Sequence, residues 1–476
     1  MVFKAALTLL SLAASATLSN AVNFGATGYV DVAVYGGTPD GKAAGILYGV
    51  PNQVAYDPNT APSFPDSLAT DAGITYVRTG GAQTPYPGWG MQANRGNYQG
   101  YEKRFASSLE NYRSARRWGA KVVLLPHDIW GGDAYADLQK GEWPCDNGDC
   151  SEYGRFLDRL IADLKSNSMV EGLAIDIWNE PDGYGFWPRS QDQFHQMYSF
   201  SFNKFRSAFP TSSGVLLQGP ATEQPPGANN GWWQAHGAYL QKNPSVIPDV
   251  YSYHALIGRY AADCGNDPVT MQQDFDALRG KYGLPIRPVQ INEFAYKDEQ
   301  TPGYYAWFIS RLERVGVSGL RANWGSRVGL HNDLARLLLP SSDGKSWSKL
   351  GEWHVAQYYR KTQTGKITLA GAAGSKCFDL YVTQDRSAGR VNILAGVRGQ
   401  EGPYPINVKN VRNMPQFANL NALRATIKEI PFNNLGAVSA PTILQNAASV
   451  PIDGNGWVNF NLTLKLDSAY TIDLFA

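Results

Sequence analysis

Two glutamates, Glu180 and Glu293, are candidates for acid–base chemistry. Glu180 lies in the run 174–183, where β-branched apolar residues give way to Trp-Asn-Glu-Pro-Asp-Gly, and Glu293 lies in the run 286–296, which contains Ile-Asn-Glu-Phe. Two carboxyl groups in different protonation states can protonate a leaving oxygen and stabilise an oxocarbenium-like centre, as cleavage of a glycosidic bond requires. We therefore predict a site that contains both glutamates.

Strands must deliver both glutamates to one place. Each apolar run has the pattern of a strand buried on both faces and stops at polar, turn-forming residues. A carboxylate at that point is typical of the carboxyl end of a strand in a parallel barrel, where such folds keep their chemistry. The glutamates are 113 residues apart, which is three βα units of roughly 35–40 residues and places them on strands four and seven.

The region 43–361 predicts a (β/α)8 TIM barrel, which is an α/β fold. Short apolar runs alternate with amphipathic helical patterns, as in a closed parallel barrel. The eight candidate strands are residues 44–50, 73–81, 120–130, 174–180, 214–221, 249–255, 286–296 and 319–325. A chain of 476 residues has room for this barrel and a smaller domain.

The sequence pattern changes after residue 361. Short alternating strands separated by turns follow, for example at 377–382, 391–397 and 470–474. They predict a small C-terminal antiparallel β-sandwich over 362–476. Residues 28–35 alternate in the same way, so we do not expect them in the barrel.

The Trp-Asn-Glu-Pro motif at residues 178–181 resembles the acid/base motif of the clan A glycoside hydrolases, with family 39 the nearest. The resemblance implies that Glu180 is the acid/base and Glu293 the nucleophile of a retaining enzyme. It also implies that the segment 22–42 joins the sandwich, because in families 39 and 79 the chain begins in that accessory domain. Family 39 usually has Thr before and Trp after the nucleophile, whereas Asn and Phe flank Glu293 here.

The resemblance also suggests residues that bind substrate or support the nucleophile. An Arg at the end of the second strand commonly supports the nucleophile carboxylate, which matches Arg78. A His or Tyr near strand six contacts the substrate or the nucleophile, which matches His254, and a Trp at the end of strand eight forms the floor of the sugar site, which matches Trp324. The alternatives are an exposed loop role for Arg78 and a structural role for His254.

Three more residues are expected to bind substrate. Asn179 should hold the hydroxyl next to the anomeric centre, in a hydrogen bond that strengthens as charge develops. Asp128 follows His127 at the end of the third predicted strand and is expected to line a sugar subsite, while a core role for His127 is equally open. Trp178 is expected at the sugar and should help to bury the neighbouring acid. The aromatic loop 182–189 is either a stacking platform or a packed loop.

The separation of the two carboxyl groups decides the stereochemical outcome. Groups roughly 5–5.5 Å apart give retention, and a gap of roughly 6.5–9.5 Å leaves room for water and gives inversion. We predict retention, with Arg78 keeping Glu293 ionised and the charge of Glu293 helping to keep Glu180 protonated. The alternatives are a noncatalytic carbohydrate-binding protein on a barrel scaffold and a transglycosylase that uses the same residues.

The composition argues against polyanionic partners. The net charge is +1 and only 17% of residues are charged, so we expect no broad basic face for nucleic acid or an acidic membrane. Aromatic residues make up 12% of the chain and suit both sugar stacking and core packing. We expect an oligo- or polysaccharide substrate, no cofactor, no nucleic-acid or membrane partner, and a monomer.

The first 21 residues have the pattern of a secretory signal peptide. A lysine precedes a short apolar core and a few small residues, and the apolar stretch is too short to span a membrane. We therefore predict a secreted, extracellular protein whose mature chain begins near Val22.

The chain contains four cysteines, and in a secreted protein these should form disulfides. Cys145 and Cys150 flank a turn and are paired locally, which pairs Cys264 with Cys377 by elimination; a metal site built on two of the thiols is the alternative. The six histidines lack the spacing of a zinc site, so no metal is predicted. Asn461 begins the one glycosylation sequon that we find, and its use requires exposure.

Overall fold

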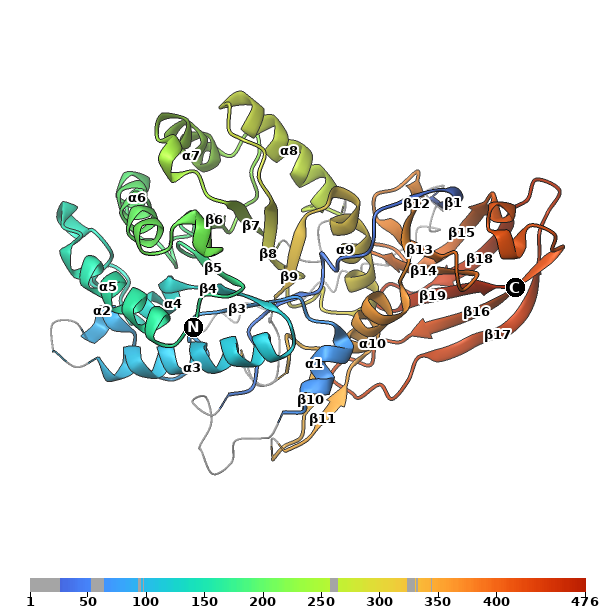
Figure 1. Ribbon diagram of the computed structural model, residues 1–476, viewed down its shortest axis with the longest axis horizontal. Coiled ribbons are helices and arrows are strands. Elements are labelled where there is room, and N and C mark those ends of the chain that lie inside the picture. The colour runs from blue at the N-terminus through green and yellow to red at the C-terminus, as the bar shows by residue number, and fades with distance from the viewer. Residues whose placement is uncertain are drawn as a thin grey trace, which may run out of the picture.

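The computed structural model describes residues 26–52, 64–92, 96, 98–256, 264–322, 330, 333–343 and 345–476 (Figure 1). The predicted signal peptide and Trp324 lie outside the described residues. Two domains lie side by side: a barrel of strands surrounded by helices, and a domain built of strands (Figure 1). Among the described residues, no helix is long and apolar enough to cross a membrane.

Eight parallel strands form the barrel, which closes where β9 pairs with β2. The strands are β2 (Gly45–Leu47), β3 (Tyr76–Thr79), β4 (Lys121–Leu124), β5 (Leu173–Asp176), β6 (Leu216–Thr222), β7 (Val250–Ala255), β8 (Val289–Phe294) and β9 (Ser318–Arg321). The predicted TIM barrel is confirmed. Glu180 follows the fourth barrel strand, β5, and Glu293 lies in the seventh, β8.

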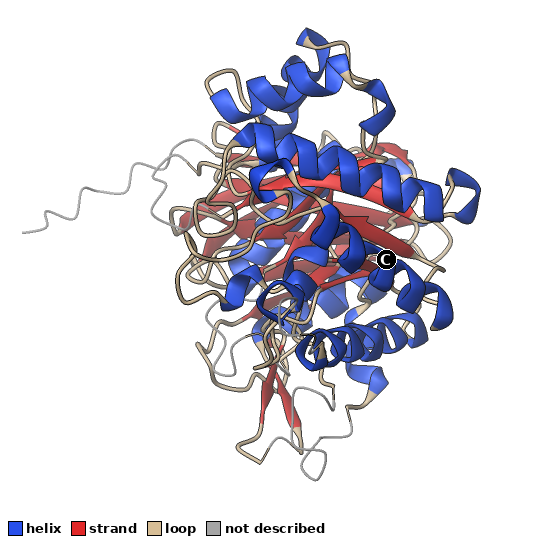
Figure 2. Cartoon of the chain, turned by 90° about the vertical axis from the view of Figure 1, so that its left-hand side faces the viewer, coloured by secondary structure: helices blue, strands red, loops and turns tan. Residues whose placement is uncertain are grey.

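Helices surround the strands (Figure 2). They are α1 (Asp66–Ala72), α2 (Trp89–Gln92), α3 (Gln99–Arg117), α4 (Pro126–Trp130), α5 (Ser151–Ser166), α6 (Gln191–Ala208), α7 (Gly231–Lys242), α8 (Pro268–Lys281), α9 (Pro302–Val315) and α10 (Gly351–Gln357), which continues as a π-helix (Tyr358–Thr362). A hairpin of β10 (Leu338–Pro340) and β11 (Trp347–Lys349) projects from the barrel (Figure 2). The amphipathic pattern of α5 buries its apolar face, including Phe156, Leu157 and Leu160.

The third barrel strand is shorter than predicted. The sequence predicts a strand over 120–130, but β4 ends at Leu124 and residues Pro126–Trp130 form α4. Pro126 has no N–H to continue a strand ladder and is favoured in the first turn of a helix, so the apolar run changes conformation there. His127 and Asp128 are therefore presented by a helix and not by a strand end.

The second domain is a mostly antiparallel structure of nine strands around its own core. Its strands are β1 (Thr27–Gly36), β12 (Lys366–Ala373), β13 (Phe378–Asp385), β14 (Arg390–Val397), β15 (Gly402–Lys409), β16 (Ala422–Ile430), β17 (Thr442–Pro451), β18 (Val458–Leu464) and β19 (Ala469–Phe475). Phe378 and Tyr404, on strands that are not neighbours in the sheet, have ring centroids 4.5 Å apart, so the sheet folds over one core. The predicted sandwich is confirmed.

The N-terminal strand β1 belongs to this domain, as predicted. It pairs antiparallel with β12 and parallel with β15. The chain therefore begins in the sandwich, forms the barrel and returns to the sandwich. Asn461 is exposed on β18, which meets the exposure requirement of the sequon; glycosylation stays a prediction.

Both predicted disulfide pairings are present. Cys145–Cys150 closes a local turn, and Cys264–Cys377 joins the barrel to the sandwich. Helix α9 is buried on most of its surface because it packs between the barrel strand β9 and the sandwich strands β13 and β14. The two domains are thus connected by a crosslink and by a shared buried helix.

Candidate active site

Glu180 stands at the carboxyl end of β5 in a strained backbone conformation. Its φ is +43°, in the left-handed region that non-glycine residues seldom adopt. Its N–H donates to the carbonyl of Ala221 at 2.8 Å, and this bond holds the turn against β6. Such strain persists only where the surrounding structure fixes it, and it is concentrated at functional sites.

Glu293 lies within β8, two strands beyond β6, and its side chain is almost fully buried. The Arg78 guanidinium donates to its Oε1 at 2.6 Å. Its other oxygen, Oε2, is buried without a hydrogen-bond partner among the described residues. A buried acceptor of this kind requires a partner that the protein itself does not supply.

The two glutamates face each other across His254. One carboxylate oxygen of Glu180, one of Glu293 and a ring nitrogen of His254 all lie within 4.8 Å of one another. His254 Nδ1 is 2.8 Å from Glu180 Oε1, and His254 Nε2 is 3.8 Å from Glu293 Oε1. Strand β7, between β6 and β8, therefore supplies a group that contacts both acids.

Arg78 is the centre of a buried polar network below the two acids. Besides Glu293, it donates to Asp176 Oδ2 at 2.8 and 3.1 Å and to Asn179 Oδ1 at 2.8 Å. Asn292 donates to the same oxygen of Asp176 at 2.6 Å. These contacts fix the guanidinium in a single orientation, because each of its donors meets a buried acceptor.

Burial raises the pKa of the candidate acids. The pKa of Glu180 rises to about 7 because of burial and, second, because of the negative charge of Glu223, while Arg78 and His127 act in the opposite direction. The pKa of Glu293 is also raised by burial, although His254 and Arg78 oppose the shift. Arg78 acts in the predicted direction and favours the ionised form of Glu293, but the effect of burial on this pKa is larger.

Burial also disfavours the charged form of the remaining site groups. Burial lowers the pKa of His254 to about 4, so this imidazole is neutral near pH 7. Burial raises the pKa of Asp176 to about 6 in spite of the adjacent Arg78. The negative charge of Glu180 also raises the pKa of Glu293, because like charges close together repel.

A cavity of about 220 Å³ opens beside the two glutamates. Its lining residues are Leu47, Tyr48, Ala82, Leu125, Asp128, Asp133, Asn179, Glu180, Phe186, Glu293 and Leu330. Asp128 forms part of the wall and accepts hydrogen bonds from the Tyr48 hydroxyl and from His127 Nδ1, the latter at 2.7 Å. Burial opposes ionisation of Asp128, but the hydrogen bonds from His127 and Tyr48 outweigh it and lower its pKa.

The predicted site residues have different positions. Glu180, Glu293, Asn179 and Asp128 line the cavity together, whereas Arg78 and His254 lie behind the glutamates and are fully buried.

Trp178 does not reach the cavity. It is fully buried, its indole N–H donates to the Phe186 carbonyl at 3.1 Å, and its ring packs edge-on against His127 and Trp187. The prediction that Trp178 contacts the sugar is therefore not supported, because an apolar cluster covers the ring. In the aromatic loop, Phe186 lines the cavity, Trp187 is buried and Tyr184 is 61% exposed.

Several site residues were not predicted from the sequence. Asp176 interrupts the apolar run of β5 and is fully buried, and a charged residue in a strand buried on both faces is a signal that could have identified it. Tyr48, which follows the first barrel strand, has no comparable signal. The carboxylate of Asp182 accepts the N–H groups of Glu223 and Gln224 at 2.8 and 2.9 Å, so it ties the loop after Glu180 to the loop after β6.

Glu180, His254 and Glu293 also have the donor atoms of a metal site. Two of their three facing atoms already form a contact with each other, His254 Nδ1 with Glu180 Oε1. The Arg78 guanidinium, 2.6 Å from Glu293 Oε1, would repel a cation at that oxygen. The arrangement favours acid–base chemistry over metal binding.

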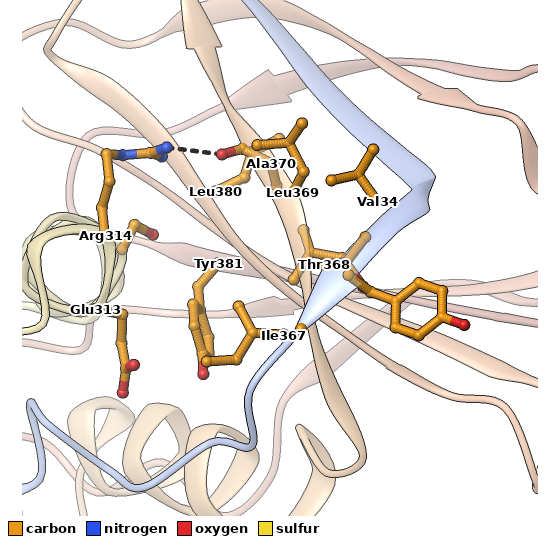
Figure 3. Close-up of a pocket in the computed structure, with 13 residues that line it drawn as sticks. Val34, Glu313, Arg314, Ile367, Thr368, Leu369, Ala370, Leu380 and Tyr381 are labelled. Carbon is orange, nitrogen blue, oxygen red and sulfur yellow. Dashed lines mark hydrogen bonds between the residues drawn. The ribbon is translucent and has the colours of Figure 1, made fainter.

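A second cavity, of about 290 Å³, lies between α9 and the sandwich (Figure 3). It is lined mainly by apolar side chains of β1, β12 and β13, with Glu313 and Arg314 of α9 on one side (Figure 3). It does not contain the carboxyl pair. Glu313 accepts a hydrogen bond from the Tyr359 hydroxyl and another from the Lys42 N–H at 3.1 Å, so its position is accounted for by packing.

Comparisons with known proteins identify a shared fold. No family model matches the sequence, and a search of curated proteins finds no match. Among solved structures, N2152 from Neocallimastix frontalis has a TM-score of 0.71 at 21% identity, over 94% of this chain and 99% of that one.

Two further structures are similar over almost the same length. The GH39 enzyme from Xanthomonas axonopodis pv. citri has a TM-score of 0.59 at 11% identity, over 94% of this chain and 97% of that one. A family 51 α-L-arabinofuranosidase from Bifidobacterium longum has a TM-score of 0.60 at 13% identity, over 94% and 99%. A family 30 xylanase is also similar. The predicted resemblance therefore holds for the fold that these enzymes share and does not single out family 39.

Proposed function

We propose that this protein is a retaining glycoside hydrolase in which Glu180 is the acid/base and Glu293 the nucleophile. The observation that carries the proposal is the pair of carboxyl groups, whose facing oxygens lie within 4.8 Å at the wall of one cavity. This separation is close to the roughly 5–5.5 Å of retaining enzymes and shorter than the roughly 6.5–9.5 Å of inverting ones. Structures of the same fold include a glucosidase, a xylanase and an arabinofuranosidase.

In the first step, a Glu293 oxygen forms a bond to the anomeric carbon while the bond from that carbon to the leaving oxygen breaks. Glu180 gives its proton to the leaving oxygen, so the aglycone departs as a neutral alcohol. Burial favours the protonated form of Glu180 at rest. Arg78 holds Glu293 Oε1, which leaves the unpartnered Oε2 as the attacking atom.

In the second step, Glu180 accepts a proton from water as the water oxygen attacks the anomeric carbon from the face that the aglycone left. The bond to Glu293 breaks and the sugar is released with its original anomeric configuration. A second sugar in place of water would give transglycosylation by the same residues, so the acceptor distinguishes these two outcomes.

Two polar side chains of the cavity wall are suited to the sugar hydroxyls. Asn179 turns its carbonyl oxygen to Arg78, which can only donate, so its amide nitrogen is free to donate to a substrate oxygen. The ionised Asp128, held by Tyr48 and His127, can accept hydrogen bonds from sugar hydroxyls. The substrate is therefore an oligo- or polysaccharide, and the two disulfides support action in an oxidising, extracellular compartment.

The decisive experiment replaces Glu180 by Ala and adds azide. We expect hydrolysis of aryl glycosides with poor leaving groups to fall by about 10²–10⁴-fold, because no acid remains to protonate the leaving oxygen. With an activated leaving group, azide should restore turnover and give a glycosyl azide with the anomeric configuration of the substrate. NMR of the product measures both outcomes.

A variant at an acid outside the cavity wall provides the matched control. Asp192→Ala, at an exposed acid of α6, should retain turnover and form no glycosyl azide. Full activity of Glu180→Ala, or an azide product of inverted configuration, would contradict the assignment. Failure of the wild-type protein to turn over any member of an aryl glycoside panel would favour a carbohydrate-binding protein.

The pH dependence of kcat/KM offers a second test. Because Glu180 must hold its proton and its pKa is about 7, kcat/KM should fall as the pH rises above about 7. Removing the nearby charge in Glu223→Gln should lower the pKa of Glu180 and move this fall to lower pH. An unchanged profile in Glu223→Gln would show that burial alone sets the pKa.

A further inference from the structure

A third cavity lies at the opposite end of the barrel from the two glutamates. Its volume is about 530 Å³, which is within the range of about 300–1,000 Å³ for small-molecule sites. Tyr76, Lys121 and Ser318, the first residues of β3, β4 and β9, line it. The cavity is thus at the amino ends of the strands. The proposed glycoside cleavage does not use it.

Cationic side chains dominate the lining of this cavity. Lys42, Lys121, Arg360 and Lys361 contribute to it, and Asp40 is the only acidic residue in the lining. The whole chain carries a net charge of only +1, so the local excess does not follow from composition.

Most of this charge has no carboxylate counter-ion among the described residues. Lys42 pairs with Asp40 at 2.9 Å, whereas the described residues offer no carboxylate partner to Lys121, Arg360 or Lys361. Arg360 Nε is buried and has no hydrogen-bond partner among them. An unpaired charge is costly at the partly buried Arg360, because burial removes solvation that nothing replaces, whereas Lys121 and Lys361 are exposed.

Two glycines make room for Arg360. Gly41 and Gly73 both have positive φ values, of +78° and +68°. A Cβ at Gly41 would lie 2.6 Å from Arg360 Cζ, and a Cβ at Gly73 would lie 2.4 Å from Arg360 Cβ. The fold therefore holds this arginine in a fitted slot beside the cavity, and its Nε has no hydrogen-bond partner among the described residues.

Helix termini balance only part of the charge. Helices α1 and α3 and the π-helix after α10 end at this cavity, and each C-terminus carries roughly half a negative charge. Three such termini offset about half of an excess of three positive charges. The positive charge that remains is available to an anionic ligand.

The geometry points to a binding site for a ligand that carries oxyanion groups, formed by Arg360, Lys121 and Lys361 around the amino ends of the strands. Inorganic sulfate or phosphate and the carboxylates of an acidic oligosaccharide share this chemistry. Lys121 lies 5.5 Å from the centroid of the half-buried Tyr76 ring, so a sugar ring could rest near Tyr76 while its carboxylates meet the cations. The site is independent of the proposed glycoside cleavage.

The test is isothermal titration calorimetry of the full chain at low ionic strength, with sodium sulfate, sodium phosphate and trigalacturonate as separate probes. We expect saturable binding of at least one probe, weakened by added NaCl. Arg360→Gln should weaken it by about tenfold or more, because a hydrogen bond to a charged group is worth about 1.5–3 kcal/mol. Tighter binding of trigalacturonate than of either inorganic ion identifies an acidic glycan; the reverse identifies a free anion.

The exposed Lys121 provides a second variant that keeps the test valid if Arg360→Gln does not fold. Lys121→Gln should also weaken binding. Lys242, an exposed lysine on α7 outside the cavity lining, is the matched control, and Lys242→Gln should leave binding unchanged. The proposal is overturned if no probe binds saturably, or if the control variant weakens binding as much as the cavity variants do.

Discussion

Two buried clusters of arginine and carboxylate groups can be compared in this protein. In the candidate active site, Arg78 contacts Asp176 and Glu293. Between the barrel and the sandwich, Arg398 pairs with Glu299 at 2.6 Å, and Arg311 pairs with Asp267 at 2.6 Å. Both clusters are built from the same side-chain chemistry.

The interface cluster pairs each carboxylate with at least one arginine, although burial still raises the pKa of Glu299 in spite of Arg398. Arg311 also pairs with Asp379 of β13 at 2.9 Å, and Arg314 pairs with the other oxygen of Asp379. Burial would raise the pKa of Asp267, but its hydrogen bonds and charge interaction with Arg311 outweigh burial and lower it.

The active-site cluster does not reach this balance. Asp176, Glu180 and Glu293 all have raised pKa values because burial exceeds the help from one arginine. Glu293 lines the cavity, and its Oε2 has no hydrogen-bond partner among the described residues. The interface has three arginines for three carboxylates, whereas the active site has one arginine for three, which leaves carboxyl groups able to exchange a proton or form a bond.

The largest expected effect is on kcat. It should differ between two buried glutamates that each contact an arginine. Glu293→Gln should lower kcat by at least about 10⁴-fold, because the proposed nucleophile is lost. Glu299→Gln removes a carboxylate of similar burial six residues later, and its kcat should remain within about tenfold of the wild-type value. The measurement is release of the aryl group from a glycoside that the wild-type protein cleaves. Equal losses in the two variants would remove the distinction between the clusters.

The second effect concerns stability. Arg398→Ala leaves the buried Glu299 without its partner and should lower the free energy of unfolding by about 3–5 kcal/mol, measured by urea denaturation. The double variant Arg398→Ala/Glu299→Ala should lose less stability than the two single variants added together, because it has no uncompensated buried charge. Arg424, an exposed arginine on β16 of the same sandwich, is the control, and Arg424→Ala should change stability by less than about 0.5 kcal/mol. Additive losses would mean that the pair is not coupled.

The smallest effect is on stability. The contributions of Glu180 and Asp267 to the free energy of unfolding should change with pH in opposite directions. The pKa of Glu180 is raised from 4.5 to about 7 in the folded state, so wild-type stability falls as the pH rises from about 4.5 to 7. Glu180→Gln removes this cost. At pH 8 its free energy of unfolding should exceed that of the wild type by up to about 3 kcal/mol.

Asp267 should behave in the opposite way. Its pKa is lowered by Arg311, so it stabilises the protein at neutral pH, and this contribution is lost as the pH falls through its folded-state pKa. Asp267→Asn should therefore be less stable than the wild type at pH 7, with a difference that shrinks in acid. Urea denaturation across the pH range measures both variants, and the same sign in both would contradict the comparison.

The sequence by itself determined the architecture. Apolar runs at regular spacing predicted the eight barrel strands, and period-two alternation predicted the sandwich, because these patterns depend on which faces of a local element are buried. The change from strand to helix at Pro126 was missed, since the apolar run continues across it. Elimination among four cysteines gave the Cys264–Cys377 pair, although nothing in the local sequence shows that it joins the two domains.

Only the tertiary structure decided which side chains meet. Arg78 contacts Asp176 and Glu293, which are 98 and 215 residues away in the chain, and His254 contacts both glutamates because β7 lies beside β8. Those contacts depend on the register of neighbouring strands and the closure of the barrel, and the cavity depends on where several loops end. The same applies to the burial that raises the pKa of Glu180, because burial is a property of the assembled barrel and its loops and not of the Trp-Asn-Glu-Pro segment.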